Sequence, residues 1–168
     1  VFVFFNDCAA DHAIPVTRER GIPVVLSSVI PDSRDYEAVL REEQIGHPEF
    51  AATLGPPELE AWLRDRRAKE FSTADLIFVP SVFVWKSLVR HGVPERKLYL
   101  IPYGVDTNQF HPNKARGHGG RTRFLFVGSL TQRKGISYLL EAFKQLNTSQ
   151  AELILVGSSP GSIDAGGF

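Results

Sequence analysis

The clearest structural signal in the sequence is the stretch Phe124-Leu-Phe-Val-Gly-Ser-Leu-Thr-Gln-Arg-Lys-Gly135, in which four apolar residues lead into a glycine turn and then into two adjacent cations. An amphipathic segment follows directly and continues to Leu146. A strand that passes through a glycine turn into a helix places backbone N–H groups, with their partial positive charge, at the mouth of the turn. Arg133 and Lys134 add full charges there, so the stretch predicts a site for an anion such as a diphosphate.

The same stretch opens a strand–helix–strand unit, with strands expected at 124–127 and 153–156 and a helix at 135–146. Five apolar residues share one face of that helix and are expected to cover the sheet: Ile136, Leu139, Leu140, Phe143 and Leu146. Two strands make a poor core. We therefore expect residues 124–168 to pack against the earlier part of the chain or to stay loose.

Strands and helices also alternate upstream, which predicts an α/β fold with a parallel sheet covered by helices. The expected strands are residues 2–5, 23–26, 76–79 and 97–101. The expected helices are residues 7–20, a short one at 36–45, 58–71, and one that starts at the capping residue Ser81 and ends at His91. Residues 113–123, rich in Gly, Arg and Lys, are interpreted as an exposed linker.

Side-chain patterns within these helices give further expectations. The 58–71 segment is interpreted as a charged surface helix with one packed side, formed by Leu59, Trp62, Leu63 and Arg66. The carboxylates of the helical segments are expected to be solvated rather than to form an acid/base pair: Glu42, Glu43 and Glu70.

The composition argues against a nucleic-acid-binding protein, a disulfide-bonded protein and a protein with a membrane helix. Nineteen basic residues balance nineteen acidic ones, so no global field favours nucleic acid, and none is expected as a partner. The single Cys8 excludes a disulfide framework, and no apolar run approaches the roughly 20 residues of a membrane helix. We expect a cytoplasmic protein, or one peripheral to the inner membrane face. The absence of methionine and the abrupt ends indicate a fragment truncated at both ends.

Other ligand signatures are missing from the sequence. It contains neither GxGxxG after a strand nor GxxxxGK[ST], and its five histidines lack metal-ligand spacing. We expect no metal and no cofactor.

Three stretches resemble glycosyltransferase family 4, whose members are retaining enzymes with the B-type fold of two Rossmann-like domains. They are Ala74–Ser81, Ile101–Asp106 with Phe110 and Pro112, and Phe126–Gly135 with Leu139 and Ala142. The resemblance implies that residues 1–112 end an acceptor-binding domain, 113–123 link it onward, and 124–168 open a nucleotide-sugar-binding domain. It covers about residues 70 to 157, in the order and spacing of the family, and implies two incomplete Rossmann-like domains.

The resemblance also implies roles for individual residues. Lys134 matches the lysine that holds the donor diphosphate, with Gly128, Ser129 and Arg133 around it. Gly157 and Ser158, after the next strand, are expected to contact the nucleotide, because ligands bind at the carboxyl ends of parallel strands.

The chain departs from the family pattern at two places that bear on the site. Ser129 stands where many members have arginine, and Arg133 could supply that charge instead. Ser27-Ser28-Val29-Ile30 replaces a histidine region, so no catalytic residue is assigned.

The implied function is transfer of a sugar from a nucleotide-diphosphate donor to a hydroxyl of a carbohydrate, lipid-linked or other acceptor, with retained configuration. One alternative is a catalytically silent module that binds a nucleotide or a glycan, motivated by Ser129. Another is that this piece alone is inactive. The sequence leaves the sugar, the base, the acceptor and the oligomeric state open.

Overall fold

The computed structural model describes residues 1–8, 10–112 and 120–159, which form two compact units. The first unit contains Val1–Val39 and Glu58–Val105. The second contains Leu40–Pro57 and the residues from Asp106 onward.

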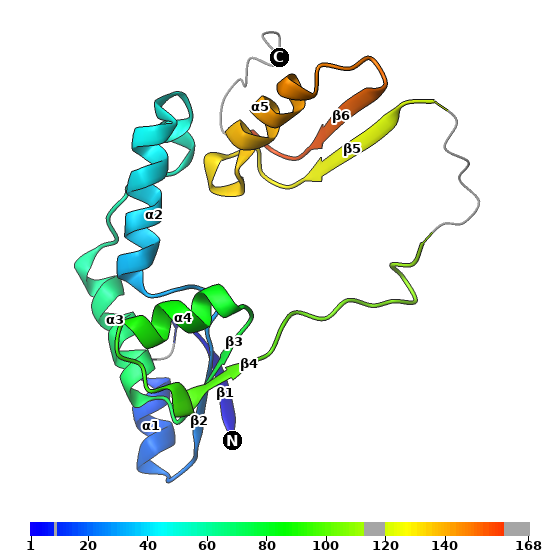
Figure 1. The fold of residues 1–168 in the computed structure, drawn as a ribbon. Coiled ribbons are helices and arrows are strands. Elements are labelled where there is room, and N and C mark those ends of the chain that lie inside the picture. The colour runs from blue at the N-terminus through cyan, green and yellow to red at the C-terminus, as the bar shows by residue number, and fades with distance from the viewer. Residues whose placement is uncertain (9, 113–119, 160–168) are drawn as a thin grey trace. The chain divides into compact units, whose positions relative to one another are not determined.

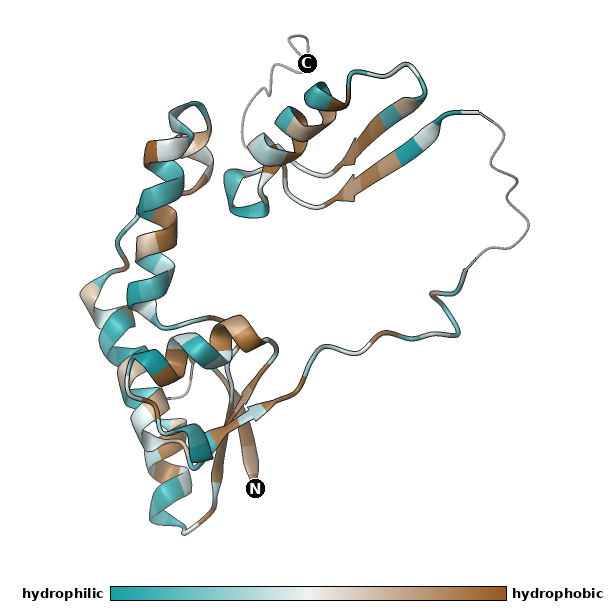
Figure 2. Ribbon diagram, viewed as in Figure 1, coloured by the Kyte–Doolittle hydropathy of each residue, from teal (hydrophilic) through white to brown (hydrophobic). Residues whose placement is uncertain are grey.

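The first unit is built on four parallel strands in the order β1–β2–β3–β4 (Figure 1). Their bounds are Phe2–Phe5, Val24–Ser27, Leu76–Val79 and Leu98–Leu100. Each expected strand lies within one residue of an observed one, so these predictions are confirmed. The strands are the most continuously apolar part of this unit (Figure 2), as expected for parallel strands that helices cover.

Helices connect and cover these strands. They are α1 (Ala13–Glu19), α2 (Ser33–Gly46), α3 (Ala61–Thr73) and α4 (Val82–Arg90), with a short 3₁₀ turn η2 (Glu95–Lys97) before β4. The core brings together fully buried aliphatic side chains from helices and strands, namely Ile14, Leu26, Ile77 and Leu88. Ser81 caps α4 as predicted, because its hydroxyl accepts a hydrogen bond from the Val84 N–H at 3.3 Å.

Two expectations for the helices are wrong. The first helix begins at Ala13 rather than at residue 7, because Asp7 has a φ of +71°, which breaks helical geometry. On α3, Trp62 is 55% exposed, whereas the buried residues are Arg67, Glu70 and Phe71. The packed side of α3 therefore lies nearer its C-terminus and includes two charged side chains.

The second unit contains a parallel pair of strands, β5 (Thr122–Val127) and β6 (Ala151–Val156), joined by α5 (Ile136–Leu146). Phe124 and Phe143 make an edge-to-face contact between β5 and α5, with ring centroids 6.2 Å apart. Ile136 and Leu140 of α5 are almost completely buried, and Leu139 and Phe143 are half-buried. The predicted covering face is therefore confirmed except at Leu146, which is 46% exposed. On the opposite sheet face, Leu125 is 64% exposed.

Two 3₁₀ turns complete the second unit: η1 (Pro48–Thr53) and η3 (Gln132–Lys134). The predicted strand–helix–strand unit packs against Leu40–Pro57, an earlier part of the chain, through these turns. β5 begins two residues inside the expected 113–123 linker, because Thr122 and Arg123 pair with Ala151 and Glu152. Residues 113–119 lie outside the described residues, and the predicted domain boundaries stay predictions.

Both sheets are parallel and carry helical crossovers, so the α/β class with Rossmann-like sheets is confirmed. Within the described ranges, no helix is both long enough and apolar enough to span a membrane.

Candidate functional site

The predicted anion site lies between β5 and α5, on the segment Gly128–Gly135, which we call the cationic loop. Arg133 and Lys134 belong to η3, the turn just before α5, and both are exposed. Gly135 separates them from the helix with a φ of +73°, a conformation that glycine adopts without strain. The loop thus presents two neighbouring cations at the start of α5.

The charges of these two side chains are available to a ligand. In the part of the chain that the structure describes, neither Arg133 nor Lys134 forms an ion pair. A bound diphosphate would accept charge-assisted hydrogen bonds from both, which are about twice as strong as neutral ones.

The backbone donors of the loop are less available than the sequence suggested. The Ser137 N–H, in the first turn of α5, donates to Gln132 Oε1 at 3.3 Å. The N–H groups of Lys134 and Gly135 donate within the loop, to Thr131 and Gln132 carbonyls at 2.9 and 2.8 Å. These three backbone N–H groups are therefore already engaged within the protein.

The glycines after the two strands meet backbone to backbone. The Gly128 N–H donates to the Val156 carbonyl at 2.9 Å, and the Leu130 N–H donates to the Ser158 carbonyl at 2.8 Å. A Cβ on Gly157 would lie 1.7 Å from the Gly128 oxygen, so only glycine fits there. Gly157 thus has a steric role, whatever it contacts in a ligand.

The structure brings most of the predicted site residues together. Gly128, Ser129, Gly157 and Ser158 lie side by side at the carboxyl edge of the β5–β6 sheet, where ligands of open α/β sheets bind. Arg133 and Lys134 follow Ser129 on the same loop.

Residues to which the sequence assigned no role at the loop hold it in place. Gln132 is 2% exposed, and its backbone N–H donates to Thr53 Oγ1 at 2.9 Å. Its side-chain amide donates to Glu43 Oε2 at 2.7 Å, and the Tyr138 hydroxyl donates to Glu43 Oε1 at 2.9 Å. Glu43 is therefore not the solvated carboxylate that we expected.

This arrangement also changes the acidity of a side chain beside the loop. The hydrogen bond to Glu43 raises the pKa of Tyr138, and the negative charge of that carboxylate acts in the same direction. The Tyr138 phenol is the donor in this hydrogen bond. No sequence pattern indicates the pairing, because Glu43 and Tyr138 lie 95 positions apart.

A carboxylate also holds the loop after β1 in the first unit. Glu70 is fully buried, so its predicted solvation is wrong. Its oxygens accept hydrogen bonds from the N–H groups of Asp7 at 2.8 Å and Ala10 at 3.3 Å. Asp7 in turn receives two hydrogen bonds from Arg67, at 2.7 and 3.0 Å. These groups fix the carboxyl end of β1.

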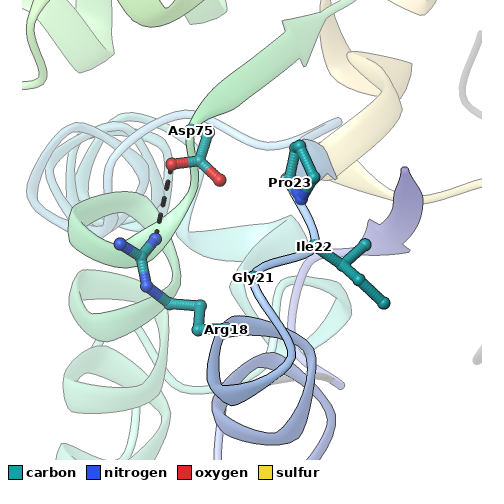
Figure 3. A pocket seen from close by; sticks show the side chains of 5 residues that line it. All are labelled: Arg18, Gly21, Ile22, Pro23 and Asp75. Atoms are coloured by element: carbon teal, nitrogen blue, oxygen red, sulfur yellow. Dashed lines mark hydrogen bonds and ion pairs between the residues drawn. The ribbon is translucent and has the colours of Figure 1, made fainter.

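A pocket of about 390 Å³ in the first unit lies at the opposite, amino edge of the sheet (Figure 3). Arg18 and Asp75 line it and form an ion pair at 3.4 Å. Asp75 also accepts a hydrogen bond from the Val24 N–H at 2.8 Å, so this carboxylate joins β2 to the segment before β3. The two charged residues that line the pocket therefore have structural roles.

Among the described residues, no group of three or more His, Cys, Asp or Glu side chains could hold a metal ion. Ser28, within the segment that replaces the histidine region, is fully buried and donates its hydroxyl to the Ile30 carbonyl at 3.2 Å. Its hydroxyl therefore serves the turn after β2.

Comparison with known proteins bears on the cationic loop directly. Residues 108–164, which contain the whole loop with Gly157 and Ser158, match the family model of glycosyl transferases group 1. The chain is also similar to the MMP alpha-(1->4)-mannosyltransferase of Mycolicibacterium hassiacum, with 27% identity over 158 residues. The alignment covers 90% of this chain and 35% of that protein, so the chain spans 35% of the length of this curated relative.

Both matches are to glycosyltransferases, and the chain is similar to only part of the relative. The matched segment is the part of the chain that carries β5, η3, α5 and β6.

Proposed function

We propose that the chain contributes the donor-diphosphate site of a retaining glycosyltransferase of family 4. The reaction moves a sugar from a nucleotide-diphosphate donor to an acceptor hydroxyl. The observation that carries the proposal is the pair of exposed cations, Arg133 and Lys134, on a loop at the carboxyl edge of a parallel sheet. That loop lies inside the segment that matches group 1 glycosyl transferases.

The chemistry of sugar transfer explains why cations are needed there. When the bond between the anomeric carbon and the phosphate oxygen breaks, the electron pair stays on that oxygen and the nucleoside diphosphate gains negative charge. A fixed ammonium group stabilises this charge more in the transition state than in the bound donor, and so accelerates transfer. We assign this role to Lys134. We further propose that Arg133 supplies the second positive charge, which Ser129 cannot provide.

The proposal requires no metal and no cofactor, because the two cations offset the diphosphate charge. The acceptor is a carbohydrate, a lipid-linked molecule or another hydroxyl compound. Mannosyl nucleotides are the first donors to test, because the relative in Mycolicibacterium hassiacum is named a mannosyltransferase.

The test is the release of nucleoside diphosphate from a panel of nucleotide sugars by the wild-type protein and by Lys134→Ala. A charge-assisted hydrogen bond contributes about 1.5–3 kcal/mol, so the variant should lose about one to two orders of magnitude in rate. Lys86→Ala, which removes an exposed lysine from α4, is the matched control and should keep full activity. Undiminished release by Lys134→Ala would contradict the proposal.

The alternative function, a binding module without catalysis, has its own outcome in the same assay. Tight binding of nucleotide sugars without release of diphosphate would favour it. Ser129 is the residue that motivates this alternative, and replacing it by arginine should then strengthen binding without producing turnover.

A further inference from the structure

The segment Leu40–Pro57, which comprises the end of α2 and η1, makes three side-chain hydrogen bonds to the region around the cationic loop. Thr53 accepts the Gln132 backbone N–H, and Glu43 accepts both the Gln132 amide and the Tyr138 hydroxyl. His47 adds an edge-on contact with the Tyr138 ring, with centroids 4.6 Å apart. All these residues belong to the second unit.

The two residues that donate side-chain hydrogen bonds to Glu43 lie on either side of the two cations in the sequence. Gln132 immediately precedes Arg133, and Tyr138 lies in the first turn of α5, four residues after Lys134. One carboxylate group, with one oxygen for each partner, therefore fixes both ends of the segment that bears the cations.

Gln132 makes this arrangement stiff. Its side chain is almost completely buried, and while Nε2 donates to Glu43 its Oε1 accepts the Ser137 N–H. Buried polar groups are costly to leave without partners, so removal of Glu43 would release the Gln132 amide and with it the turn η3.

We propose that Glu43 is a positioning residue for the diphosphate site, acting on Arg133 and Lys134 through Gln132 and Tyr138. Its function is to hold the loop in the conformation that meets the ligand, so that the cost of ordering the loop is not paid on binding. That the loop binds a diphosphate rests on the proposed function. The hydrogen bonds by which Glu43 holds the loop do not depend on any ligand.

Because Glu43 is negatively charged, the proposal predicts a change in anion affinity opposite to the one that charge alone predicts. A carboxylate near an anion site repels the anion, so by Coulomb's law alone its removal should strengthen binding. Positioning predicts the reverse, because a released loop must be ordered again. Glu42, an exposed carboxylate on the preceding residue of α2, is a matched control for charge without contact to the loop.

The experiment measures the affinity of the full chain for GDP and for inorganic pyrophosphate by calorimetry, well below the unfolding temperature. We expect Glu43→Ala to weaken binding about tenfold and Glu42→Ala to leave it unchanged or slightly tighter. Glu43→Gln, which keeps one acceptor oxygen, should show an intermediate loss. Binding by Glu43→Ala that equals or exceeds the wild-type affinity would overturn the proposal, even if its unfolding temperature falls.

Amide hydrogen exchange tests the hold on the loop without any ligand. In Glu43→Ala, and to a lesser degree in Tyr138→Phe, peptides covering residues 130–138 should exchange at least several-fold faster than in Glu42→Ala. Equal exchange in all three variants would refute the positioning role. If the wild-type protein does not bind pyrophosphate, which carries no base, the proposed diphosphate site fails, and hydrogen exchange still decides the role of Glu43.

Discussion

At the scale of single residues, Gly157 makes the strictest demand on the site. An added Cβ would lie 1.7 Å from the Gly128 oxygen, a backbone atom that can move only with the strand end. We expect Gly157→Ala to reduce the free energy of unfolding by about 1–3 kcal/mol, the usual cost of overpacking. Urea unfolding followed by circular dichroism measures it.

The control for this prediction is Gly104→Ala, because a Cβ at Gly104 would have no atom within 4 Å. Gly104→Ala should change the unfolding free energy by less than about 0.5 kcal/mol, as surface substitutions usually do. Equal stability of the two variants would show that the ends of β5 and β6 are not in contact.

Glu70 is the second residue whose removal has a defined consequence. Glu70→Ala leaves the N–H groups of Asp7 and Ala10 without their acceptor, and each buried donor left unpaired costs about 1–3 kcal/mol. Urea unfolding followed by tryptophan fluorescence should detect this loss, because Trp62 and Trp85 both belong to the first unit.

The comparison for Glu70 is Asp65→Ala, an exposed carboxylate on the same helix. If both variants unfold at the same urea concentration, the carboxylate of Glu70 contributes nothing beyond its charge.

At the scale of elements, the contact between α2 and α4 depends on pH. Asp35, in the first turn of α2, lies 2.9 Å from His91 Nε2 and 3.2 Å from Arg90 Nη1. Burial raises the pKa of Asp35, but hydrogen bonds from His91 and Ser87 and the charges of His91 and Arg90 outweigh it. The folded pKa is therefore lower than in the unfolded chain.

A lowered carboxyl pKa contributes stability that is complete above the unfolded value of about 3.9 and is lost as the pH falls through the folded value. We expect Asp35→Asn to be less stable than wild type at pH 6, and the difference to shrink as the pH falls below about 4. Urea unfolding at a series of pH values measures it. A constant difference across the series would contradict the assignment.

The elements also show what sequence patterns can predict. The strands of the first sheet and the helix after Ser81 follow from apolar runs, capping residues and glycine stops, which are local signals. The packed side of α3 does not follow from local signals, because Arg67 and Glu70 are buried against partners in the loop after β1, which is distant in the sequence. Periodicity of apolar residues cannot indicate a buried side that is partly charged.

The candidate site also contains some residues whose positions the sequence predicts and others whose roles it does not. The positions of Gly128, Arg133 and Lys134 could be predicted because strand, turn and helix follow one another directly. The roles of Glu43 and Thr53 could not, since their partner Gln132 lies 89 and 79 residues away and Leu40–Pro57 has no distinctive pattern.

At the scale of the whole molecule, the two units differ in how well they cover their sheets. All of β2 except Ser27 is buried, whereas β5 exposes most of its residues. Amide hydrogen exchange should therefore be slowest in β2 and β3 and clearly faster in β5 and β6, because local stability follows burial. Equal protection of β2 and β5 in a mass-spectrometric exchange experiment would contradict this ranking.

We have proposed that the cationic loop binds a diphosphate, and the affinity of the wild-type chain and of Lys134→Ala for GDP and for GMP tests this proposal. We predict that wild type prefers GDP by at least about tenfold, corresponding to roughly 1.4 kcal/mol, and that Lys134→Ala loses this preference while Lys86→Ala keeps it. A GDP preference that survives in Lys134→Ala would place the diphosphate elsewhere and contradict the account.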